Sequence, residues 1–367
     1  MIPSIHRPAY IEVDLNNIAS NIKQVLNHLN NGEEIFAVVK ANAYSHGIVE
    51  VSKTALESGA TGLCVATLDE ALEIRDAKIN APILVLGVTE ATDVSLASEK
   101  NISLTVADND WISEVKKQDF DKINIHLGID SGMSRIGYTN REMIEEAITM
   151  IKADKRINPE GIFTHFATAD DPDDTYFQQQ LTIFHKLTDD LEIEFKYKHV
   201  ANSATALWRE QSDFNMVRLG IAMYGMNPSG TSIELPYKLK PAFNLYSELV
   251  FVKEVKPGTK IGYGATYTAE ENQWIGTIPI GYADGWLRRM SGFEVLINGQ
   301  RCPIVGRICM DQFMVRLPEK YKAGTKVTIL GKDEFGNKIT IQEAAEYADT
   351  INYEIVCSLS ERLPRIY

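Results

Sequence analysis

One pattern repeats between residues 35 and 217 of this 367-residue chain: a short apolar run, then a longer stretch with helical spacing. Parallel neighbouring strands need crossover connections, usually helices, so this alternation predicts an α/β fold with a parallel sheet. Eight such runs indicate an N-terminal (β/α)8 barrel. The expected strands are Ile35–Val39, Gly62–Ala66, Ile83–Leu86, Ile102–Val106, Ile123–Leu127, Gly161–Phe163, Tyr197–Val200 and Phe214–Val217.

The stretches between these runs carry helix signals. Asp14 can cap a helix that continues to about Leu29, because apolar residues recur there near the spacing of one helical face. We expect these helices to cover the outside of the barrel. The others are Ile48–Ser58, Leu68–Asp76, Arg141–Ala153 and Tyr176–Leu191.

The pattern changes at Pro241, where alternating apolar and polar residues with turn signals between them indicate strands. One clear helix is expected near Gln342–Ala348. We therefore predict a barrel over residues 1–240 and a mostly-β second domain over residues 241–367, with residues 1–14 able to pair with the second domain. The alternating runs are Leu249–Val255, Trp274–Pro279 and Val327–Leu330.

The composition, with 44% hydrophobic and 24% charged residues, suits a globular protein that buries a large core. A formal net charge of −13 argues against nucleic acid or a membrane surface as a partner, since both select basic faces. The four cysteines show no paired metal-ligand spacing, so we expect no metal, and buried reduced thiols suit the cytoplasm. We find neither a signal-peptide core at the N-terminus nor a stretch long enough to span a bilayer.

Lys40 closes the first apolar run and precedes a loop that contains a tyrosine, a histidine and a glycine. Active sites of (β/α)8 barrels form at the C-terminal ends of the strands, which is where this lysine is expected. A partly desolvated lysine amine forms Schiff bases with aldehydes, whereas an ordinary strand-end lysine only extends its amine to water. The other strand ends decide between these two interpretations.

Polar side chains follow the later runs at the same predicted rim. Taken singly, each has an ordinary explanation as a core histidine, an ion-pair partner or a helix N-cap. Loops after the last two barrel strands commonly hold phosphate, and together with Lys40 they suggest a phosphorylated aldehyde cofactor. The residues are Asp130, Ser131 and Arg135 after the fifth run, His165 after the sixth, Asn202 and Ser203 after the seventh, and Arg218, Gly220 and Ile221 after the eighth.

Five segments, taken as an ordered set, resemble the alanine racemase family, and the similarity runs essentially end to end. The resemblance implies a barrel that binds pyridoxal 5'-phosphate, a C-terminal β domain, and a homodimer whose active sites are shared between the subunits. The segments are Ala37-Val-Val-Lys-Ala-Asn-Ala-Tyr44, His126-Leu-Gly-Ile-Asp-Ser-Gly-Met-Ser-Arg-Ile-Gly137, Val217-Arg-Leu-Gly-Ile221, Tyr263-Gly-Ala-Thr-Tyr-Thr268 and Gly306-Arg-Ile-Cys-Met-Asp-Gln312.

The resemblance also implies roles for single residues. Lys40 would hold the cofactor covalently and Arg218 would face its pyridine nitrogen. His165 would lie against the cofactor ring and contact Arg218, with Asn202 nearby. The cofactor phosphate would be held by Tyr44, Ser203, Gly220, Ile221 and Tyr353. Arg135 would contact the cofactor phenolate and the substrate carboxylate, and the partner subunit would contribute residues matching Tyr263, Met310 and Asp311.

The implied activity is that of an alanine racemase (EC 5.1.1.1), which interconverts L- and D-alanine and supplies D-alanine for peptidoglycan. Inverting Cα requires losing a proton on one face and gaining one on the other, and Lys40 and Tyr263 are suitable bases. Two alternatives stay open: a racemase that prefers serine or accepts many amino acids, and a non-catalytic pyridoxal-phosphate carrier. The carrier would need neither the second domain nor the second base.

Gly128 departs from the family pattern, in which many members have a lysine, often carbamylated, that supports the arginine matching Arg135. A partly buried, unpaired cation is costly, so we expect a small anion or water beside Gly128 to support Arg135, in preference to Asp130. Activity would then be insensitive to bicarbonate and responsive to halide. Ser45 and Gly262 also depart from common family residues, and we interpret both as tolerable loop changes.

Overall fold

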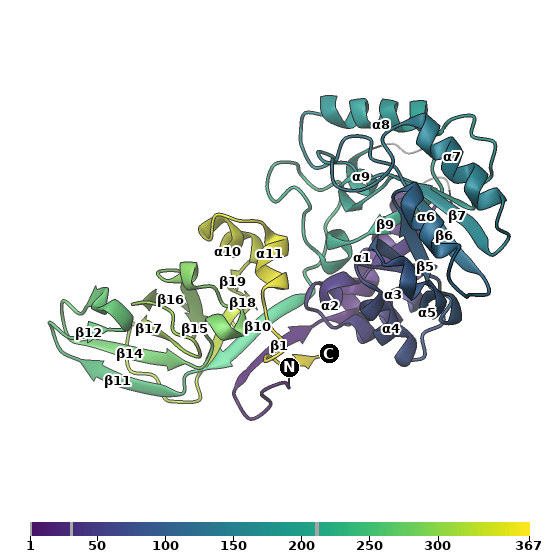
Figure 1. Ribbon diagram of the computed structural model, residues 1–367. Helices are drawn as coiled ribbons and strands as arrows, with labels where there is room; N and C mark the ends of the chain where they lie inside the picture. The colour runs from purple at the N-terminus through teal and green to yellow at the C-terminus, as the bar shows by residue number, and fades with distance from the viewer. Residues whose placement is uncertain (1, 30–31, 210–212) are drawn as a thin grey trace. The chain divides into compact units, whose positions relative to one another are not determined.

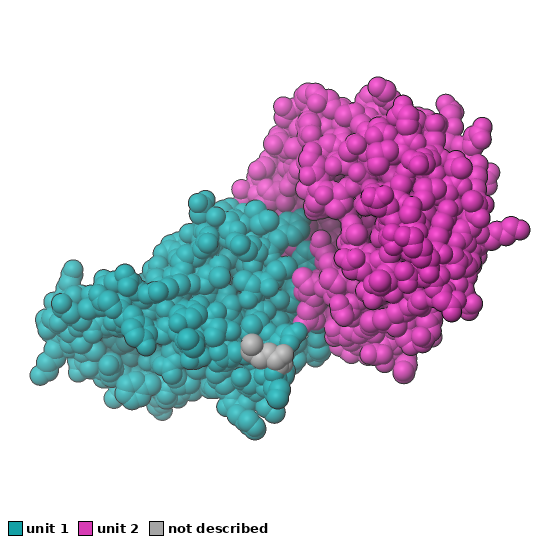
Figure 2. Space-filling model, viewed as in Figure 1, with its two compact units in different colours: residues 1–15, 44–47, 242–367 teal, residues 16–43, 48–241 magenta. Residues whose placement is uncertain are grey.

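The computed structural model describes residues 2–29, 32–209 and 213–367, and the chain divides into two compact units (Figure 2). The barrel unit comprises Asn16–Ala43 and Ile48–Pro241. The β unit comprises Met1–Leu15, Tyr44–Gly47 and Ala242–Tyr367. The short segment Tyr44–Gly47 thus belongs to the β unit, although barrel residues flank it in sequence on both sides.

The barrel unit contains an eight-stranded parallel sheet in the order β8-β7-β6-β5-β4-β3-β2-β9. This confirms the predicted (β/α)8 architecture. β7 begins at Ile157 rather than at Gly161, because its first half is polar and hid the strand from the apolar pattern. The strands are β2 (Glu34–Val38), β3 (Gly62–Val65), β4 (Ile83–Val88), β5 (Ser103–Val106), β6 (Ile123–Gly128), β7 (Ile157–Phe163), β8 (Tyr197–His199) and β9 (Met216–Leu219).

The barrel closes where its last two strands meet. β9 pairs with β2 from Glu34↔Met216 to Ala37↔Leu219. β8 and β9 are joined beyond the end of β8 by a parallel bridge between Ala201 and Val217, and Arg218 N donates to Ala201 O at 3.0 Å. The carboxyl ends of β2, β8 and β9 therefore meet at one rim, as the sequence predicted for Lys40, Ser203 and Arg218.

Helices surround the barrel (Figure 1). α4 has a complete capping box, in which Thr67 Oγ1 accepts from Glu70 N and the Glu70 carboxylate accepts from Thr67 N. α7 begins after Asn140, whose side chain accepts from Met143 N. The helices are α1 (Leu15–His28), α3 (Ile48–Glu57), α4 (Leu68–Asp76), α5 (Val94–Glu99), α6 (Asn109–Val115), α7 (Arg141–Lys152), α8 (Thr175–Thr188) and α9 (Ser203–Trp208).

The β unit is built on a sheet ordered β11-β14-β17-β16-β15-β18-β10-β1-β20, to which β19 adds beside β18. β1 (Ala9–Val13) lies at the start of the chain yet pairs antiparallel with β10, from Ala9↔Ser247 to Val13↔Phe243. The remaining strands are β10 (Phe243–Glu248), β11 (Phe251–Val255), β14 (Gln273–Ile278), β15 (Glu294–Ile297), β16 (Gln300–Val305), β17 (Phe313–Leu317), β18 (Lys326–Lys332), β19 (Lys338–Ile339) and β20 (Arg365–Ile366), with β12 (Lys260–Ile261) and β13 (Tyr267–Thr268) forming a separate pair.

The β unit contains two α-helices near its C-terminus where the sequence indicated one. α10 (Ile341–Tyr347) matches the expected helix. α11 (Asn352–Cys357) was missed, because six residues are too few to establish a helical period, and it carries Tyr353. Among the helices that the structure describes, none combines the length and apolar character needed to cross a bilayer.

Candidate active site

Lys40 stands at the start of a left-handed turn that directly follows β2. Ala41, Asn42 and Ala43 have φ of 52° to 53° and ψ of 47° to 51°, and positive φ continues through Tyr44 and Ser45. Left-handed backbone costs L-residues about 1 to 2 kcal/mol each, so the surrounding structure must hold this turn in place. The alanine-rich segment contains no glycine that would indicate a left-handed turn, and the sequence analysis did not predict one.

Contacts from three other segments of the barrel unit hold this turn. The Glu70 carboxylate of α4 accepts from Ala41 N at 2.6 Å and from Ala66 N at 2.7 Å. Asn42 Oδ1 accepts from Ile48 N at 2.8 Å, and Tyr224 donates its hydroxyl to Val38 O at 2.9 Å. These contacts fix the backbone from which Lys40 projects.

Arg218 lies inside the barrel rim with only 3% of its surface exposed. Its Nη1 donates to His199 Nδ1 at 2.6 Å and to His199 O at 3.2 Å. Its Nη2 donates to Thr164 O at 2.8 Å, to Val200 O at 3.2 Å and to His165 Nδ1 at 3.3 Å. Within the described residues all these bonds use the two terminal nitrogens, which leaves the Nε–H as the guanidinium's remaining donor.

His165 meets Arg218 as the sequence predicted, and its surroundings keep it neutral. Burial, followed by the positive charges of Arg218, Arg135 and Lys40, lowers the pKa of His165 to about 3. Cys64 faces the same charges, but burial raises the pKa of its thiol to about 12, so it supplies no anion at neutral pH. The rim is therefore positively charged.

Ser203 and the backbone after β9 converge at one point. Ser203 Oγ accepts from Gly220 N at 2.9 Å and from Ala222 N at 3.4 Å. Two donors directed at this oxygen polarise its hydroxyl, which suits it to donate to an anion. Asn202 is the N-cap of α9, with Oδ1 accepting from Thr205 N at 2.9 Å, so its oxygen has the capping role that the sequence left as the ordinary explanation.

Arg135 differs from the expectation. Its side chain is exposed, and among the described residues it forms neither a hydrogen bond nor an ion pair. In the single chain the guanidinium is therefore solvated, and its support by a small anion or water beside Gly128 stays a prediction. Asp130 does not compensate either, because its Oδ1 accepts from Gly132 N and Ser134 N in its own loop. A Cβ at Gly128 would meet Phe163 and Thr105 at 3.5 to 3.6 Å, which is ordinary contact.

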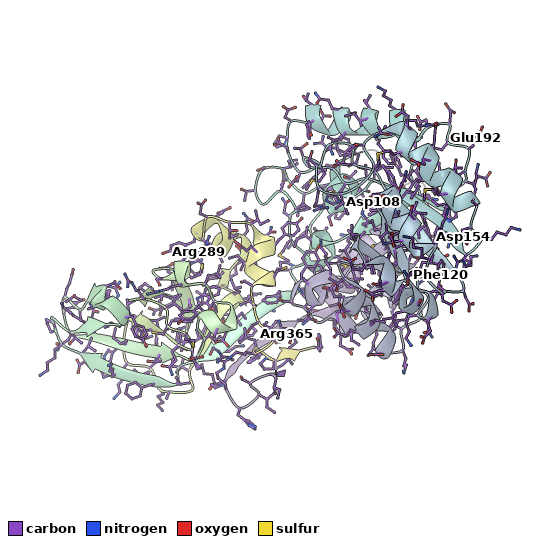
Figure 3. All side chains as sticks on the ribbon, viewed as in Figure 1. Asp108, Phe120, Asp154, Glu192, Arg289 and Arg365 are labelled. Atoms are coloured by element: carbon purple, nitrogen blue, oxygen red, sulfur yellow. The ribbon has the colours of Figure 1, made fainter. Side chains whose placement is uncertain are left out.

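Two of the predicted phosphate-binding residues lie together in the β unit. The rings of Tyr44 and Tyr353 are 6.1 Å apart. The Tyr44 segment is held by Arg365, labelled in Figure 3, whose Nε donates to Ser45 O at 2.9 Å. Ser45 Oγ in turn donates to Leu359 O at 3.0 Å, so this serine binds the Tyr44 segment to the backbone near the C-terminus.

The other predicted residues of the β unit stand at its surface. Tyr263 is 69% exposed and Met310 is 52% exposed. Asp311 accepts from Arg362 Nη2 at 2.8 Å, and Arg362 also pairs with the buried carboxylate of Asp284. Tyr263 thus lies in a short surface turn and not in the core of the β unit.

Sequence reasoning missed three participants in the rim network. Glu70 lies on a helix and holds the Lys40 turn, while His126 and His199 lie within strands and contact one another at 2.9 Å. A signal was present for the histidines, because an imidazole inside an otherwise apolar strand needs a buried partner. The identity of that partner depends on strand order, which the sequence did not supply.

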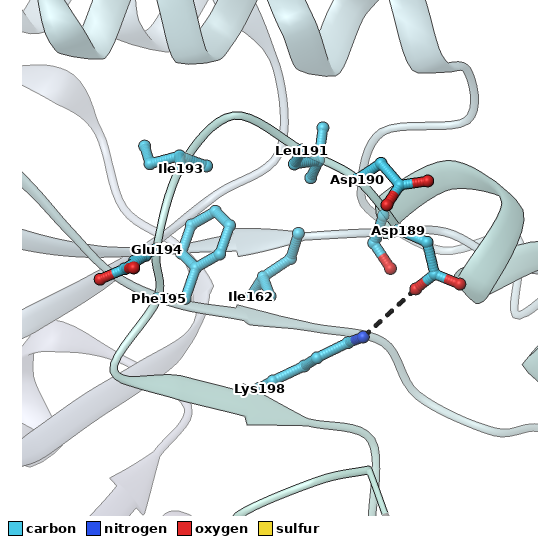
Figure 4. A pocket seen from close by; sticks show the side chains of 9 residues that line it. Ile162, Asp189, Asp190, Leu191, Ile193, Glu194, Phe195 and Lys198 are labelled. Carbon is cyan, nitrogen blue, oxygen red and sulfur yellow. Dashed lines mark hydrogen bonds and ion pairs between the residues drawn. The ribbon is translucent and has the colours of Figure 1, made fainter.

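A surface pocket of about 640 Å³ lies elsewhere on the barrel unit, beside β7, β8 and the end of α8 (Figure 4). Three carboxylates and one lysine line it, and Lys198 Nζ lies 3.4 Å from Asp189 Oδ1. None of the predicted site residues lines it. The lining residues are Ile162, Thr188, Asp189, Asp190, Leu191, Ile193, Glu194, Phe195 and Lys198.

Comparison with known proteins covers both units. Residues 13–228 match the family model described as "Alanine racemase, N-terminal domain", and residues 242–367 match "Alanine racemase, C-terminal domain". An alanine racemase from Latilactobacillus sakei is 54% identical over 369 residues, covering 98% of this chain and 97% of that protein. The crystal structure of alanine racemase from E. faecalis superposes with a TM-score of 0.97 at 47% identity over 100% of both chains. A histidine racemase from Leuconostoc mesenteroides superposes with a TM-score of 0.94 at 36% identity, over 100% of this chain and 99% of that one.

Proposed function

Because the chain belongs to the alanine racemase family, we propose that it interconverts L- and D-alanine and so supplies D-alanine for peptidoglycan. The observation that carries this proposal is the 54% identity along 98% of the chain to a protein of that name. A non-catalytic carrier would not need the β unit, of which residues 242–367 match the second family model. No disulfide joins the cysteines of the described residues, which suits a reducing compartment, and we place the enzyme in the cytoplasm. These cysteines are Cys64, Cys302, Cys309 and Cys357.

Pyridoxal 5'-phosphate fits the polar groups of the barrel rim. Lys40, Arg135 and Arg218 bring positive charge to His165, and the neutral Cys64 thiol does not balance it, so an anionic ligand is favoured. The polarised Ser203 hydroxyl with the backbone of Gly220 and Ile221 suits the phosphate, and the remaining Nε–H of Arg218 suits a ring nitrogen. When bound, the cofactor supplies an electron sink for the negative charge that develops at the substrate Cα.

Each barrel residue would then have a separate role in binding the cofactor or the substrate. Lys40 Nζ would anchor the cofactor and exchange a proton with Cα on one face. Arg218 would donate to the ring nitrogen and, as a permanent cation, would keep that nitrogen unprotonated. His165, neutral at physiological pH, would pack against the ring without adding charge. Arg135, exposed and without a protein partner among the described residues, is available to bind the substrate carboxylate.

The β unit would supply the second base and the remaining phosphate contacts. Tyr44 and Tyr353 lie together there, and their hydroxyls would bind the phosphate. Tyr263 Oη would exchange the proton on the opposite face of Cα, as two-base racemisation requires. Since Tyr263 and Met310 are at the surface of the single chain, we propose that a partner subunit receives them in a homodimer with shared sites.

A racemase with a different or wider substrate range is the second candidate, because a histidine racemase is among the structural neighbours. Purified protein incubated with L-alanine should lose optical rotation until both enantiomers are equal, and it should do so with D-alanine as well. Parallel incubations with L-serine and L-histidine would rank the substrates. No loss of rotation with any of the three would contradict the proposed activity.

A further inference from the structure

A row of polar side chains crosses the barrel interior behind Arg218, and each member comes from a different strand. Ser103 of β5 donates to Glu160 Oε2 of β7 at 2.6 Å. Glu160 Oε2 lies 3.3 Å from His126 Nε2 of β6, and His126 Nδ1 lies 2.9 Å from His199 Nε2 of β8. The row ends at β9, where His199 Nδ1 lies 2.6 Å from Arg218 Nη1. Both imidazoles are fully buried, with the Tyr197 ring stacked on His126 and the Phe163 ring stacked on His199.

The direction of every hydrogen bond in this row follows from Arg218. A guanidinium can only donate, so His199 Nδ1 must accept and the His199 proton must be on Nε2. That proton points at His126 Nδ1, which must therefore accept, so His126 carries its proton on Nε2 as well. The last acceptor is the Glu160 carboxylate. The chain of bonds thus runs one way, from the cation to the anion.

Both imidazoles in this row are neutral at physiological pH, because burial lowers their pKa values. Desolvation, opposed in part by Glu160, lowers the pKa of His126, and desolvation together with the charge of Arg218 holds the pKa of His199 well below its usual value. Burial raises the pKa of Glu160, but the hydrogen bonds from His126 and Ser103 outweigh it and the net shift is downward. Glu160 is therefore ionised at neutral pH.

The strands are shaped to bring Glu160 to this place. β6 and β7 pair Ile125 with Pro159 and then His126 with Gly161, so Glu160 is an extra residue in a β-bulge. A Cβ at Gly161 would lie 2.3 Å from His126 Nδ1, so any side chain at this position would clash with the imidazole. Bulges of this kind redirect a side chain, and here the redirected side chain is a carboxylate facing into the row.

Arg218 needs such a counter-charge. Among the described residues no carboxylate contacts it, and its hydrogen-bond partners are imidazoles and carbonyl oxygens. The Phe163 ring lies 5.4 Å from the guanidinium carbon, and Arg135 and the neutral Cys64 thiol also act on its charge. A buried cation without an anion is costly, and polarised hydrogen bonds in series transmit charge compensation over a distance. Lys196 is the other charge beside Glu160.

We propose that Glu160 is a positioning residue for Arg218, and that it acts by accepting the last hydrogen bond of the row Arg218–His199–His126. Glu160 accepts the Nε2–H of His126 in the arrangement that Arg218 imposes, and His199 then holds Nη1 so that the Nε–H of Arg218 stays directed at its ligand. The tautomers follow from the structure alone, whereas the effect on turnover rests on the proposed function.

Histidine side-chain ¹H–¹⁵N spectra of the holoenzyme at neutral pH test the tautomers, with signals assigned from His126→Gln and His199→Gln. In the wild type both residues should be neutral with the proton on Nε2; a proton on Nδ1 of either would overturn the proposal whatever the enzyme's substrate. In Glu160→Met, which fills the same space without an acceptor, the Nε2–H of His126 loses its hydrogen bond, so the His126 signal should shift while Arg218 keeps the proton of His199 on Nε2. An unchanged His126 signal in Glu160→Met would also overturn the proposal.

Kinetics on the same variants test positioning. Glu160→Met should lower kcat about tenfold with KM little changed, a loss of the size seen when outer hydrogen-bond partners are removed from metal sites. Glu160→Gln keeps an oxygen acceptor but removes the charge, is the safer variant for folding, and should retain the tautomers with a smaller loss of kcat than Glu160→Met; loss of the tautomers in Glu160→Gln would contradict the acceptor role. Glu34→Gln is the matched control, because Glu34 accepts from Thr61 and Tyr197 and lies outside the row. An equal loss in Glu34→Gln would overturn the assignment.

Discussion

The two units present their candidate residues in opposite ways. In the barrel unit Arg218 is 3% exposed and its side chain is bonded to two neighbouring segments. The turn after Lys40 is held by Glu70, Ile48 and Tyr224. In the β unit Tyr263 is 69% exposed and Met310 is 52% exposed. The candidate groups of the barrel unit are thus held by packed strands. The exposed Tyr263 and Met310 side chains can act on a substrate only if another protein surface covers them.

This difference suggests a division of labour. The barrel unit builds a rigid, positively charged rim on its own, because its residues arrive from strands whose order is set by the sheet. The β unit holds Tyr44 and Tyr353 together but leaves Tyr263 on a short turn between β12 and β13. The barrel residues should therefore act within one chain, and Tyr263 should act across a dimer.

Lys40→Ala should have the largest consequence, since it removes both the proposed covalent anchor and one base. We expect racemisation to fall by more than about 10⁴-fold, the upper end of what one general base contributes. Borohydride reduction followed by peptide mapping should place the cofactor on Lys40. Lys53→Ala is the control, because Lys53 forms only an exposed ion pair with Glu50. A label on any other lysine would contradict the assignment.

Tyr263→Phe removes one hydroxyl and should lower racemisation about 10²- to 10⁴-fold while leaving cofactor binding intact. Tyr347→Phe, at another exposed tyrosine of the β unit, should have little effect. Near-normal rates in Tyr263→Phe would show that Tyr263 is not a base.

Mixing the two inactive proteins tests whether the site is shared between subunits. After subunit exchange, Lys40→Ala and Tyr263→Phe should together recover about a quarter of wild-type activity, because half of the dimers are mixed and each has one complete site. Measuring exchange separately, for example with two affinity tags, is essential. Lasting inactivity despite complete exchange would place Tyr263 in the same chain as its Lys40.

Acidification should weaken the barrel unit through its buried histidines. The pKa of His165 is lowered to about 3, mainly by burial, and the pKa values of His126 and His199 are also lowered from the usual 6.5. Between pH 6.5 and pH 3 the unfolded chain binds more protons than the folded chain. The contribution of these histidines to the free energy of unfolding is therefore complete above about pH 6.5 and declines as the pH falls toward 3. Urea unfolding at a series of pH values should show this decline.

In His165→Asn the free energy of unfolding should fall less steeply with decreasing pH, because one group that takes up a proton on unfolding is removed. His6→Asn is the control, since His6 is exposed. A free energy of unfolding that stays constant from pH 7 to pH 5 would contradict the neutral, buried state of these imidazoles.

Tyr353→Ala should have the smallest effect, a shift in substrate preference. Tyr353 packs beside Tyr44, and we propose that its ring limits the space beside the substrate side chain. Steric discrimination of this kind is worth about tenfold or somewhat more per added group, so the ratio of kcat/KM for serine to that for alanine should rise by about that factor. Equal use of alanine and serine by the wild type would contradict a size-limiting role for Tyr353.

Much of the barrel was predictable, because strand ends and strand order follow from regular alternation. Lys40, His165, Ser203 and Arg218 were placed at one rim by that rule alone, and the structure brings Arg218 to His165 and Ser203 to Gly220. Arg135 shows the limit of the same reasoning. Its position after β6 was predictable, but its exposure depends on how the following loop turns, and that loop is held by Asp130.

The sequence by itself determined the (β/α)8 barrel, the change to a β domain and the strand-end lysine, because these depend on short-range periodicity and on which residue ends a strand. Only the tertiary structure decided the left-handed turn after Lys40, the choice of β10 as the partner strand of β1, and the row from Glu160 to Arg218. Each of these joins residues whose distance in sequence says nothing about their distance in space. A carboxylate 58 positions before an arginine becomes its counter-charge only when a bulge and four neighbouring strands bring both to one line of hydrogen bonds.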